Sequence, residues 1–214
     1  MKPHEIEQKS MEIITKELGE RTFKEPEFSV VKRCIHTSAD FDYADNLKFS
    51  TDSVRLGMEA IKRGAHIVTD TNMAAAGINK RVLSSYGGEV HCYMADLDVA
   101  NEAKERGVTR SIVCMERGAQ LTGEVIFAIG NAPTALIRIC ELVKEGKVKP
   151  ALIIGAPVGF VNVLESKELL LSMKEVPYIV AGGRKGGSNI AAAICNAMIY
   201  EAKKETEKEE KREE

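Results

Sequence analysis

The sequence predicts an α/β fold in which a doubly wound, mainly parallel sheet carries helices on both faces. Five short runs rich in apolar and β-branched residues recur along the chain, and segments with helical spacing of apolar residues separate most of them. A glycine-bearing loop follows each of the last three runs, as expected where a strand turns into a helix. The expected strands are residues 65–69, 90–94, 123–129, 151–154 and 177–181.

Helices are expected before the first strand and between the strands. Residues 3–18 carry a partial apolar stripe and end at Gly19, and a second helix over 27–35 completes an N-terminal helical extension. Thr51 or Asp52 is a typical N-cap for a helix that ends at Arg63. The remaining expected helices cover 96–106, 109–121, 133–145, a segment that ends at 173, and an alanine-rich segment after 189.

The length of 214 residues is sufficient for one substantial core, so we expect a single domain over 1–200. Residues 201–214 contain seven Glu and five Lys or Arg and form a charged C-terminal tail, expected as a solvated helix end or as disordered chain. This tail accounts for the net charge of −2, so the rest of the chain is neutral. No basic field of the kind that nucleic-acid binding requires is therefore predicted.

Composition also limits the location and the metal content. No run approaches 18 apolar residues and the N-terminus has no apolar signal segment, so we expect a cytoplasmic protein without a membrane segment. The five cysteines lie at least 22 residues apart, which argues against structural zinc and against a secreted disulfide framework. Four scattered histidines give no indication of a metal site on the protein.

The segment 33–50 is the strongest candidate for chemistry. It combines His36 and Arg33 with three aspartates, three hydroxyl side chains and several aromatic residues. Imidazole is the side chain that ordinarily gives and takes protons near neutral pH, and His36 stands where the helix over 27–35 is expected to end. Arg33 precedes it by three residues, so the two would share a helix face. A buried histidine bonded to a carbonyl and an exposed arginine remain the structural alternatives.

Polar residues at strand ends form a second group of candidates. Asp70, Thr71 and Asn72 follow the first strand, and ligands of open α/β sheets bind beyond the carboxyl ends of strands. The alternative is that they only cap the next helix. Gly130, Asn131 and Pro133 follow the third strand as a strand-to-helix corner, whose helix N-terminus is expected to be free to take an anion.

The loop 182–189, GGRKGGSN, adds Arg184 and Lys185 to backbone N–H groups that glycine leaves accessible. A phosphate-binding loop is not supported, because in a P-loop the lysine follows the last glycine, whereas Lys185 precedes the glycine pair 186–187. A dinucleotide fingerprint is absent as well. The same backbone donors and cations suit other anions, carboxylates included.

Four segments together resemble the precorrin-8X and cobalt-precorrin-8 methylmutases of corrin biosynthesis. These segments are IHTSADFDYADNLKFS (35–50), GNAPTAL (130–136), GAPVGFVNVLESKELL (155–170) and GGRKGGSNIAAA (182–193). The resemblance covers the chain from about Ser10 to Ala197 and implies a flavodoxin-like homodimer without a separate cofactor. It also implies an isomerase that moves a methyl group from C-11 to C-12 of a corrin precursor.

The resemblance assigns roles to particular residues. His36 matches the catalytic histidine, while Ser10 and Arg110, the latter in a Thr-Arg-Ser step, match substrate-binding positions. On composition alone Ser10 would be a solvent-facing serine. The sequence of residues 37–45 is closer to that of the family members whose substrate already carries cobalt. Any cobalt is therefore expected to arrive in the substrate. A non-catalytic corrinoid carrier and a nucleotide-dependent transferase are the competing hypotheses.

Overall fold

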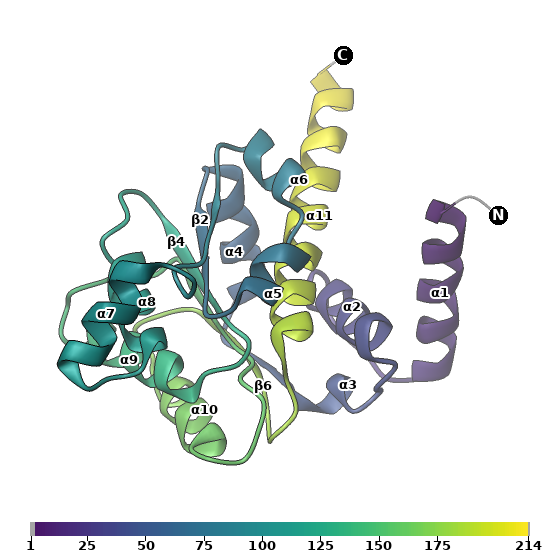
Figure 1. Ribbon diagram of the computed structural model, residues 1–214. Helices are drawn as coiled ribbons and strands as arrows, with labels where there is room; N and C mark the ends of the chain where they lie inside the picture. The colour runs from purple at the N-terminus through teal and green to yellow at the C-terminus, as the bar shows by residue number, and fades with distance from the viewer. Residues whose placement is uncertain (1–2, 214) are drawn as a thin grey trace.

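In a computed structural model, which describes the backbone of residues 3–213 and the side chains of 5–212, the chain forms three layers with a sheet between two groups of helices (Figure 1). The sheet has six strands in the order β1-β6-β5-β4-β2-β3. The strands are β1 (Leu47–Phe49), β2 (His66–Thr69), β3 (Val90–His91), β4 (Val125–Ile129), β5 (Leu152–Gly155) and β6 (Tyr178–Ala181).

Strands β2 to β6 are parallel, and their order β3-β2-β4-β5-β6 is that of a flavodoxin-like sheet. The prediction of a doubly wound sheet is therefore confirmed, with one additional strand. The extra strand, β1, pairs antiparallel with β6 and places Leu47 opposite Ala181. It has only three residues, too few for an alternating pattern to be recognised in the sequence.

Helices cover both faces of the sheet. One layer packs α2, α4, α5 and α11 against the face that carries Ile67 and Ile154, and the other packs α8, α9 and α10 against the face that carries Phe127 and Ile153. The helices are α1 (Pro3–Leu18), α2 (Glu27–Ser38), α3 (Tyr43–Asn46), α4 (Ser53–Lys62), α5 (Asn72–Gly77), α6 (Lys80–Ser85), α7 (Leu97–Arg106), α8 (Arg110–Gly118), α9 (Pro133–Lys144), α10 (Val163–Leu171) and α11 (Ser188–Glu213).

Several element boundaries differ from those expected. Strand β3 ends at His91 rather than at 94, and α8 ends at Gly118 rather than at 121. Asp52 stands at the N-cap of α4 with a left-handed backbone, but its side chain makes no capping hydrogen bond. No helix in the described part of the chain is long and apolar enough to cross a membrane.

The expected division between residues 200 and 201 falls inside α11, which continues without a break to Glu213. The first turns of the charged tail are packed against the body of the protein. Ala202 is buried, Thr206 is hydrogen-bonded to Tyr86 at 3.0 Å, and Glu205 pairs with Lys62 at 2.9 Å. Figure 1 shows α11 extending beyond the sheet, while α1 packs beside α2 away from it.

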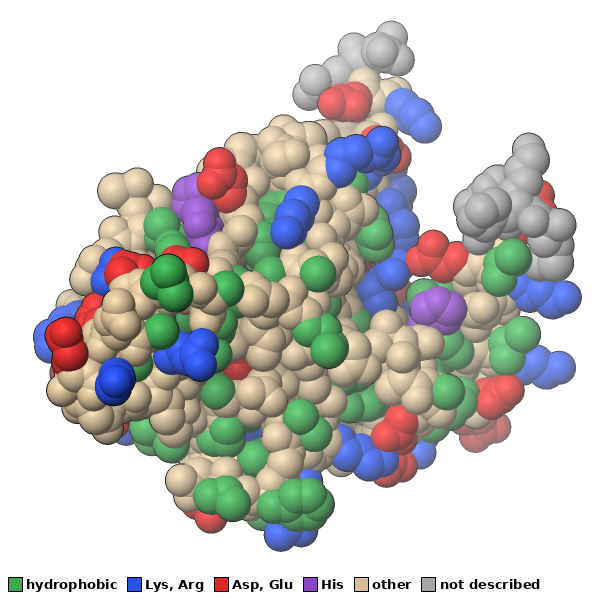
Figure 2. Space-filling model, viewed as in Figure 1, with side chains coloured by type: hydrophobic (Ala, Val, Ile, Leu, Met, Phe, Trp, Pro, Cys, Tyr) green, Lys and Arg blue, Asp and Glu red, His purple; other side chains and the backbone are tan. Residues whose placement is uncertain are grey.

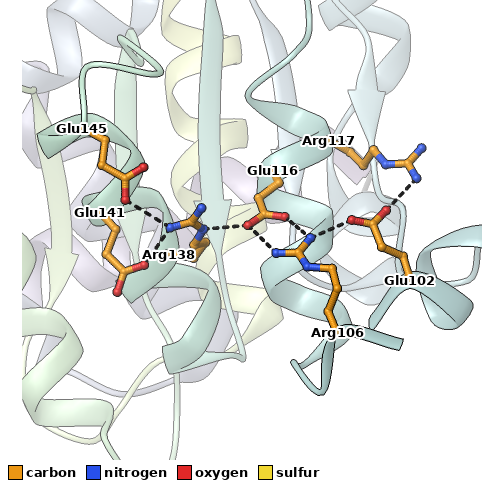
Figure 3. Close-up of polar contacts among 7 residues, drawn as sticks. All are labelled: Glu102, Arg106, Glu116, Arg117, Arg138, Glu141 and Glu145. Carbon is orange, nitrogen blue, oxygen red and sulfur yellow. Dashed lines mark hydrogen bonds and ion pairs between the residues drawn. The ribbon is translucent and has the colours of Figure 1, made fainter. Parts of the chain in front are cut away.

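A network of ion pairs joins the outer sides of α7, α8 and α9 (Figure 3). Glu116 on α8 accepts hydrogen bonds from Arg106 on α7 and from Arg138 on α9, at 2.5 and 2.8 Å. Arg117, in the last turn of α8, pairs with Glu102 at 3.0 Å. Partly exposed pairs of this kind contribute little individually, about 0.2–1 kcal/mol, so the network adds modestly to the packing of these three helices.

Candidate active site

The carboxyl edge of the sheet collects most of the predicted site residues, because parallel strands end on the same side. The loops that follow β2, β4, β5 and β6 are joined there by hydrogen bonds. Thr71 Oγ1 and Ser188 Oγ lie 2.7 Å apart, and Gly187 donates its N–H to the carbonyl of Ala156 at 2.9 Å. These bonds hold three of the loops together, and a hydrogen bond from Gly130 to Asp70 adds the loop after β4.

Asp70 links the two strands at which the strand order reverses. Its carboxylate accepts the backbone N–H groups of Gly130, Asn131 and Ala132 at 2.8, 2.8 and 2.6 Å, and its side chain is fully buried. Burial raises the pKa of Asp70, whereas the three N–H donors act in the opposite direction because they stabilise the ionised form. These bonds occupy the N–H groups of the corner that precedes α9, whereas the anion site expected at the first turn of the helix itself stays a prediction.

The segment after His36 is attached to the same edge. Lys185 Nζ contacts the carboxylates of Asp40 and Asp42, each at 2.6 Å, and Gly182 donates its N–H to the carbonyl of Asn46 at 2.8 Å. The hydrogen bond from Lys185 lowers the pKa of Asp40, and the two aspartates raise the pKa of Lys185. In this structure Lys185 therefore holds two loops together, and binding a substrate anion would require it to leave this pair.

His36 lies in the last turn of α2 with an exposed side chain, so the alternative of a buried histidine does not hold. Arg33, one turn earlier, points toward α11: its guanidinium stacks 4.5 Å from the ring centre of Tyr200 and binds Glu7 of α1 at 2.7 Å. Ser10 donates to the carbonyl of Ile6 within α1 at 2.9 Å. No hydrogen bond or ion pair among the described residues joins Arg33 or Ser10 to His36.

Arg33 lines a groove of about 490 Å³ between α1, α2 and the middle of α11. Lys32, Lys203 and Lys204 line it as well, and Figure 2 shows Lys and Arg side chains along the part of α11 that faces α1. Substrate binding through Arg33 would exchange the carboxylate of Glu7 for one of the substrate.

The other predicted residues lie on the edge itself. Thr71 caps α5 by accepting the N–H of Ala74 at 3.1 Å, while Asn72 and Asn131 have exposed side chains. Arg110, in the first turn of α8, is exposed and approaches the carbonyl of Met94 at 3.4 Å. The side chains of Asn72, Asn131 and Arg110 face solvent, where a ligand can reach them, whereas Thr71 is half-buried.

Arg184 lies on the exposed loop between β6 and α11, with its guanidinium 5.6 Å from the ring centre of Phe160. Phe160 and its neighbour Val161, both about four-fifths exposed at 82% and 79%, belong to the loop after β5. Neither of these two apolar side chains was expected from the sequence to contact a ligand. Next to a cation they offer an apolar surface for a ring system whose substituents are anionic.

Lys167 is a further residue that sequence reasoning missed. It lies on α10 with only 2% of its surface exposed, and its Nζ donates to the carbonyls of Gly183 and Lys185 at 2.7 and 2.8 Å. It therefore fixes the loop that carries Arg184. The signal was present in the helical spacing, because Lys167 shares the buried stripe of α10 with Val163, Ser166 and Leu170.

The burial of Lys167 leads to a prediction about stability. Burial lowers the pKa of Lys167 to about 8, while an unfolded lysine titrates near 10.4. Between these values the unfolded chain binds more protons, so this group makes the free energy of unfolding rise with pH, by at most about 1.4 kcal/mol per pH unit. We expect Lys167→Met to remove that contribution. Urea unfolding of both proteins between about pH 7.5 and about pH 10 measures it, and equal slopes for the two proteins would contradict the prediction.

The protein is an α/β protein in which the loops at the carboxyl edge of the sheet carry cations and exposed apolar side chains. An exposed imidazole lies on the adjoining helix, α2. Comparison with known proteins identifies the group to which it belongs. The family model for precorrin-8X methylmutase matches residues 5–201. The chain belongs to the precorrin-8X methylmutase family, which is a family of isomerases.

Individual relatives cover nearly the whole chain. A cobalt-precorrin-8 methylmutase from Priestia megaterium is 44% identical over 92% of this chain and 88% of its own. A precorrin-8X methylmutase from Pseudomonas aeruginosa is 43% identical over 79% of this chain and 81% of its own. The crystal structure of precorrin-8x methyl mutase from Thermus thermophilus superimposes with a TM-score of 0.85 at 38% identity, covering 93% of this chain and 98% of that one.

Proposed function

We propose that this chain is a cobalt-precorrin-8 methylmutase, which moves a methyl group from C-11 to C-12 of its tetrapyrrole substrate to give the corrin chromophore. The observation that carries the proposal is the family match over residues 5–201, which includes His36 and all four motif segments. We favour the cobalt-containing substrate, because relatives of that name include the 44% identical protein and the 42% identical one from Leptospira interrogans. Cobalt then enters as part of the substrate, and the protein needs no cofactor of its own.

The rearrangement makes limited demands on the protein. The bond from the methyl group to C-11 breaks as its bond to C-12 forms, so no oxidant, reductant or nucleophile is consumed. In this proposal His36 donates a proton near the ring C nitrogen, which biases the conjugated double bonds toward migration. Arg110, Arg184 and Arg33 hold substrate carboxylates, and Thr71, Asn72 and Asn131 provide polar groups at the sheet edge. Phe160 provides an apolar surface beside Arg184.

One optical experiment tests the activity. The purified protein is incubated with cobalt-precorrin-8 and, separately, with the metal-free compound, and the absorption spectrum is followed with time. We expect the spectrum of the corrin product to appear, and to appear faster with the cobalt compound. Spectral change on binding without isomerisation would favour a corrinoid carrier instead. Thermal stabilisation by a nucleotide but not by corrinoids would favour a nucleotide-dependent transferase.

Replacement of Arg110 tests the binding role. Guanidinium pairs with carboxylates through two parallel hydrogen bonds, and loss of such a charge-assisted bond costs about 1.5–3 kcal/mol. We therefore expect Arg110→Ala to weaken binding of the corrin product by about 10- to 150-fold in Kd, measured by spectroscopic titration. Arg117→Ala, in the last turn of the same helix, serves as the matched control and should bind normally. Wild-type affinity in Arg110→Ala would remove this residue from the site.

We also propose that the protein is a homodimer in the cytoplasm. The resemblance supports the dimer, as do the exposed apolar side chains of Ile6 and Ile13 on α1, a helix that packs beside α2 only at the margin of the fold. Five free cysteines are consistent with a reducing compartment. Sedimentation velocity at micromolar concentration should give a species of twice the chain mass of 23.5 kDa. A lone 23.5 kDa species under these conditions would count against the dimer.

A further inference from the structure

At the edge of the sheet farthest from β1, the register brings two histidines together. Strands β2 and β3 are parallel with Val68 opposite His91, so these two side chains share a face. His66 lies two residues before Val68 and therefore projects from that same face. His66 and His91 are 25 positions apart in the sequence, so the sequence alone did not show that they are close, and no metal site was expected from the histidines.

We propose that His66, His91 and Glu89 form a binding site for a divalent transition-metal ion of the Zn²⁺ or Co²⁺ type. His66 Nδ1 and His91 Nε2 lie 3.4 Å apart, and one carboxylate oxygen of Glu89 lies 3.8 Å from that His91 nitrogen. One donor atom from each of the three residues fits within 4.8 Å of the others. A tetrahedral ion at about 2.0–2.1 Å from two nitrogens holds them about 3.3–3.4 Å apart, so the imidazole pair already has the spacing for chelation.

The surroundings hold the rings while leaving the third ligand mobile. The His91 ring stacks on Tyr93 at 6.1 Å between centres and meets the His66 ring edge-on at 5.1 Å. The Glu89 side chain is 71% exposed, so it can make the small movement that coordination requires. Binding would release one weak contact, because His66 Nδ1 accepts the backbone N–H of Glu89 at 3.2 Å.

The donor set determines the class of ion. Two imidazoles and one carboxylate suit zinc, cobalt, nickel or copper, whereas calcium and magnesium prefer oxygen ligands alone. Three protein ligands leave at least one position for water. On the face shown in Figure 2, histidine side chains appear in two separate places, one of them beside an acidic side chain.

The position of the site indicates its effect. His66 begins β2, at the opposite end of this strand from Asp70 and Thr71, and the proposed ion would bridge it to His91, which lies opposite Val68 in the register. Strand β3 has only two residues and one neighbouring strand, and a metal bridge from His66 to His91 would fasten it to the sheet. An ion that binds only the folded state stabilises that state. The expected role is therefore stabilisation of the sheet edge.

The test uses the full-length protein after treatment with a chelator. Zn²⁺ alone is added, binding is followed by titration calorimetry, and the thermal midpoint is measured with and without the ion. We expect one ion per chain, a higher midpoint with Zn²⁺, and at least tenfold weaker binding in His91→Phe, which keeps the ring stack but removes the nitrogen ligand. Glu89→Gln alters an exposed side chain only and should also weaken binding, by several-fold.

Two control variants remove other candidate ligands. Cys92→Ser takes away the adjacent thiol and His36→Ala takes away the exposed imidazole on α2, and both should bind Zn²⁺ as the wild type does. Absence of binding at micromolar Zn²⁺ would overturn the proposal. It would also be overturned if His91→Phe and Glu89→Gln bound normally, or if only a control variant lost the ion.

Discussion

Replacement of His36 by alanine is expected to slow the methyl rearrangement by about 10²- to 10⁴-fold, the usual contribution of a positioned general acid. An ammonium group would hold its proton too firmly for this role, and an ordinary carboxylic acid would have lost it near neutral pH. Imidazole ordinarily titrates between these extremes. The fold should be retained, because the side chain is exposed at the end of α2 and substitutions at such positions usually change stability by less than about 0.5 kcal/mol.

The variant His36→Asn separates two ways in which His36 could act. The amide side chain that it introduces can donate a hydrogen bond to the substrate but cannot transfer a proton at neutral pH. We expect single-turnover rates of His36→Asn to be close to those of the alanine variant, with product affinity near that of the wild type in both. Normal turnover by His36→Asn would show that a hydrogen bond suffices. Full activity in His36→Ala would show that His36 and the segment that follows α2 have a structural role and not a catalytic one.

Local patterns were sufficient to predict most of the fold. The five parallel strands are short apolar runs bounded by glycine or polar residues, and the lengths of the connections leave a parallel arrangement as the natural one. Strand β1 could not be recognised in this way, since Leu47–Phe49 includes an exposed lysine and is defined by its pairing with β6. The continuation of α11 beyond residue 200 likewise depends on tertiary contacts such as that between Tyr86 and Thr206.

The candidate site was recognised from motifs, whereas its internal contacts were not. Glycine-rich loops and the position of His36 indicated where chemistry would occur. The pairing of Lys185 with Asp40, the donation by Lys167 to the loop after β6, and the bonds of Asp70 all join segments brought together only by the fold. A single sequence contains no direct record of such distant pairs. Only the buried stripe of α10 placed Lys167 where its burial could have been anticipated.

Asp70 carries the largest expected effect on stability. Asp70→Ala would leave the N–H groups of Gly130, Asn131 and Ala132 without their acceptor, in the corner where β4 leads into α9. A buried donor that loses its partner costs about 1–3 kcal/mol, so we expect the free energy of unfolding to fall by about 3–5 kcal/mol. Urea denaturation monitored by circular dichroism measures this change.

Two further variants of this corner show whether the carboxylate itself is responsible. Asp70→Asn retains one acceptor oxygen but turns an NH₂ group toward a backbone N–H, so an intermediate loss of about 1–3 kcal/mol is expected. Asn131→Ala keeps the backbone N–H that Asp70 accepts and removes only an exposed side chain, so its stability should stay within about 0.5 kcal/mol of the wild type. If Asp70→Ala unfolded at the same urea concentration as Asn131→Ala, the three hydrogen bonds would not stabilise this corner. Water would then accept hydrogen bonds from the three N–H groups as well as the carboxylate does.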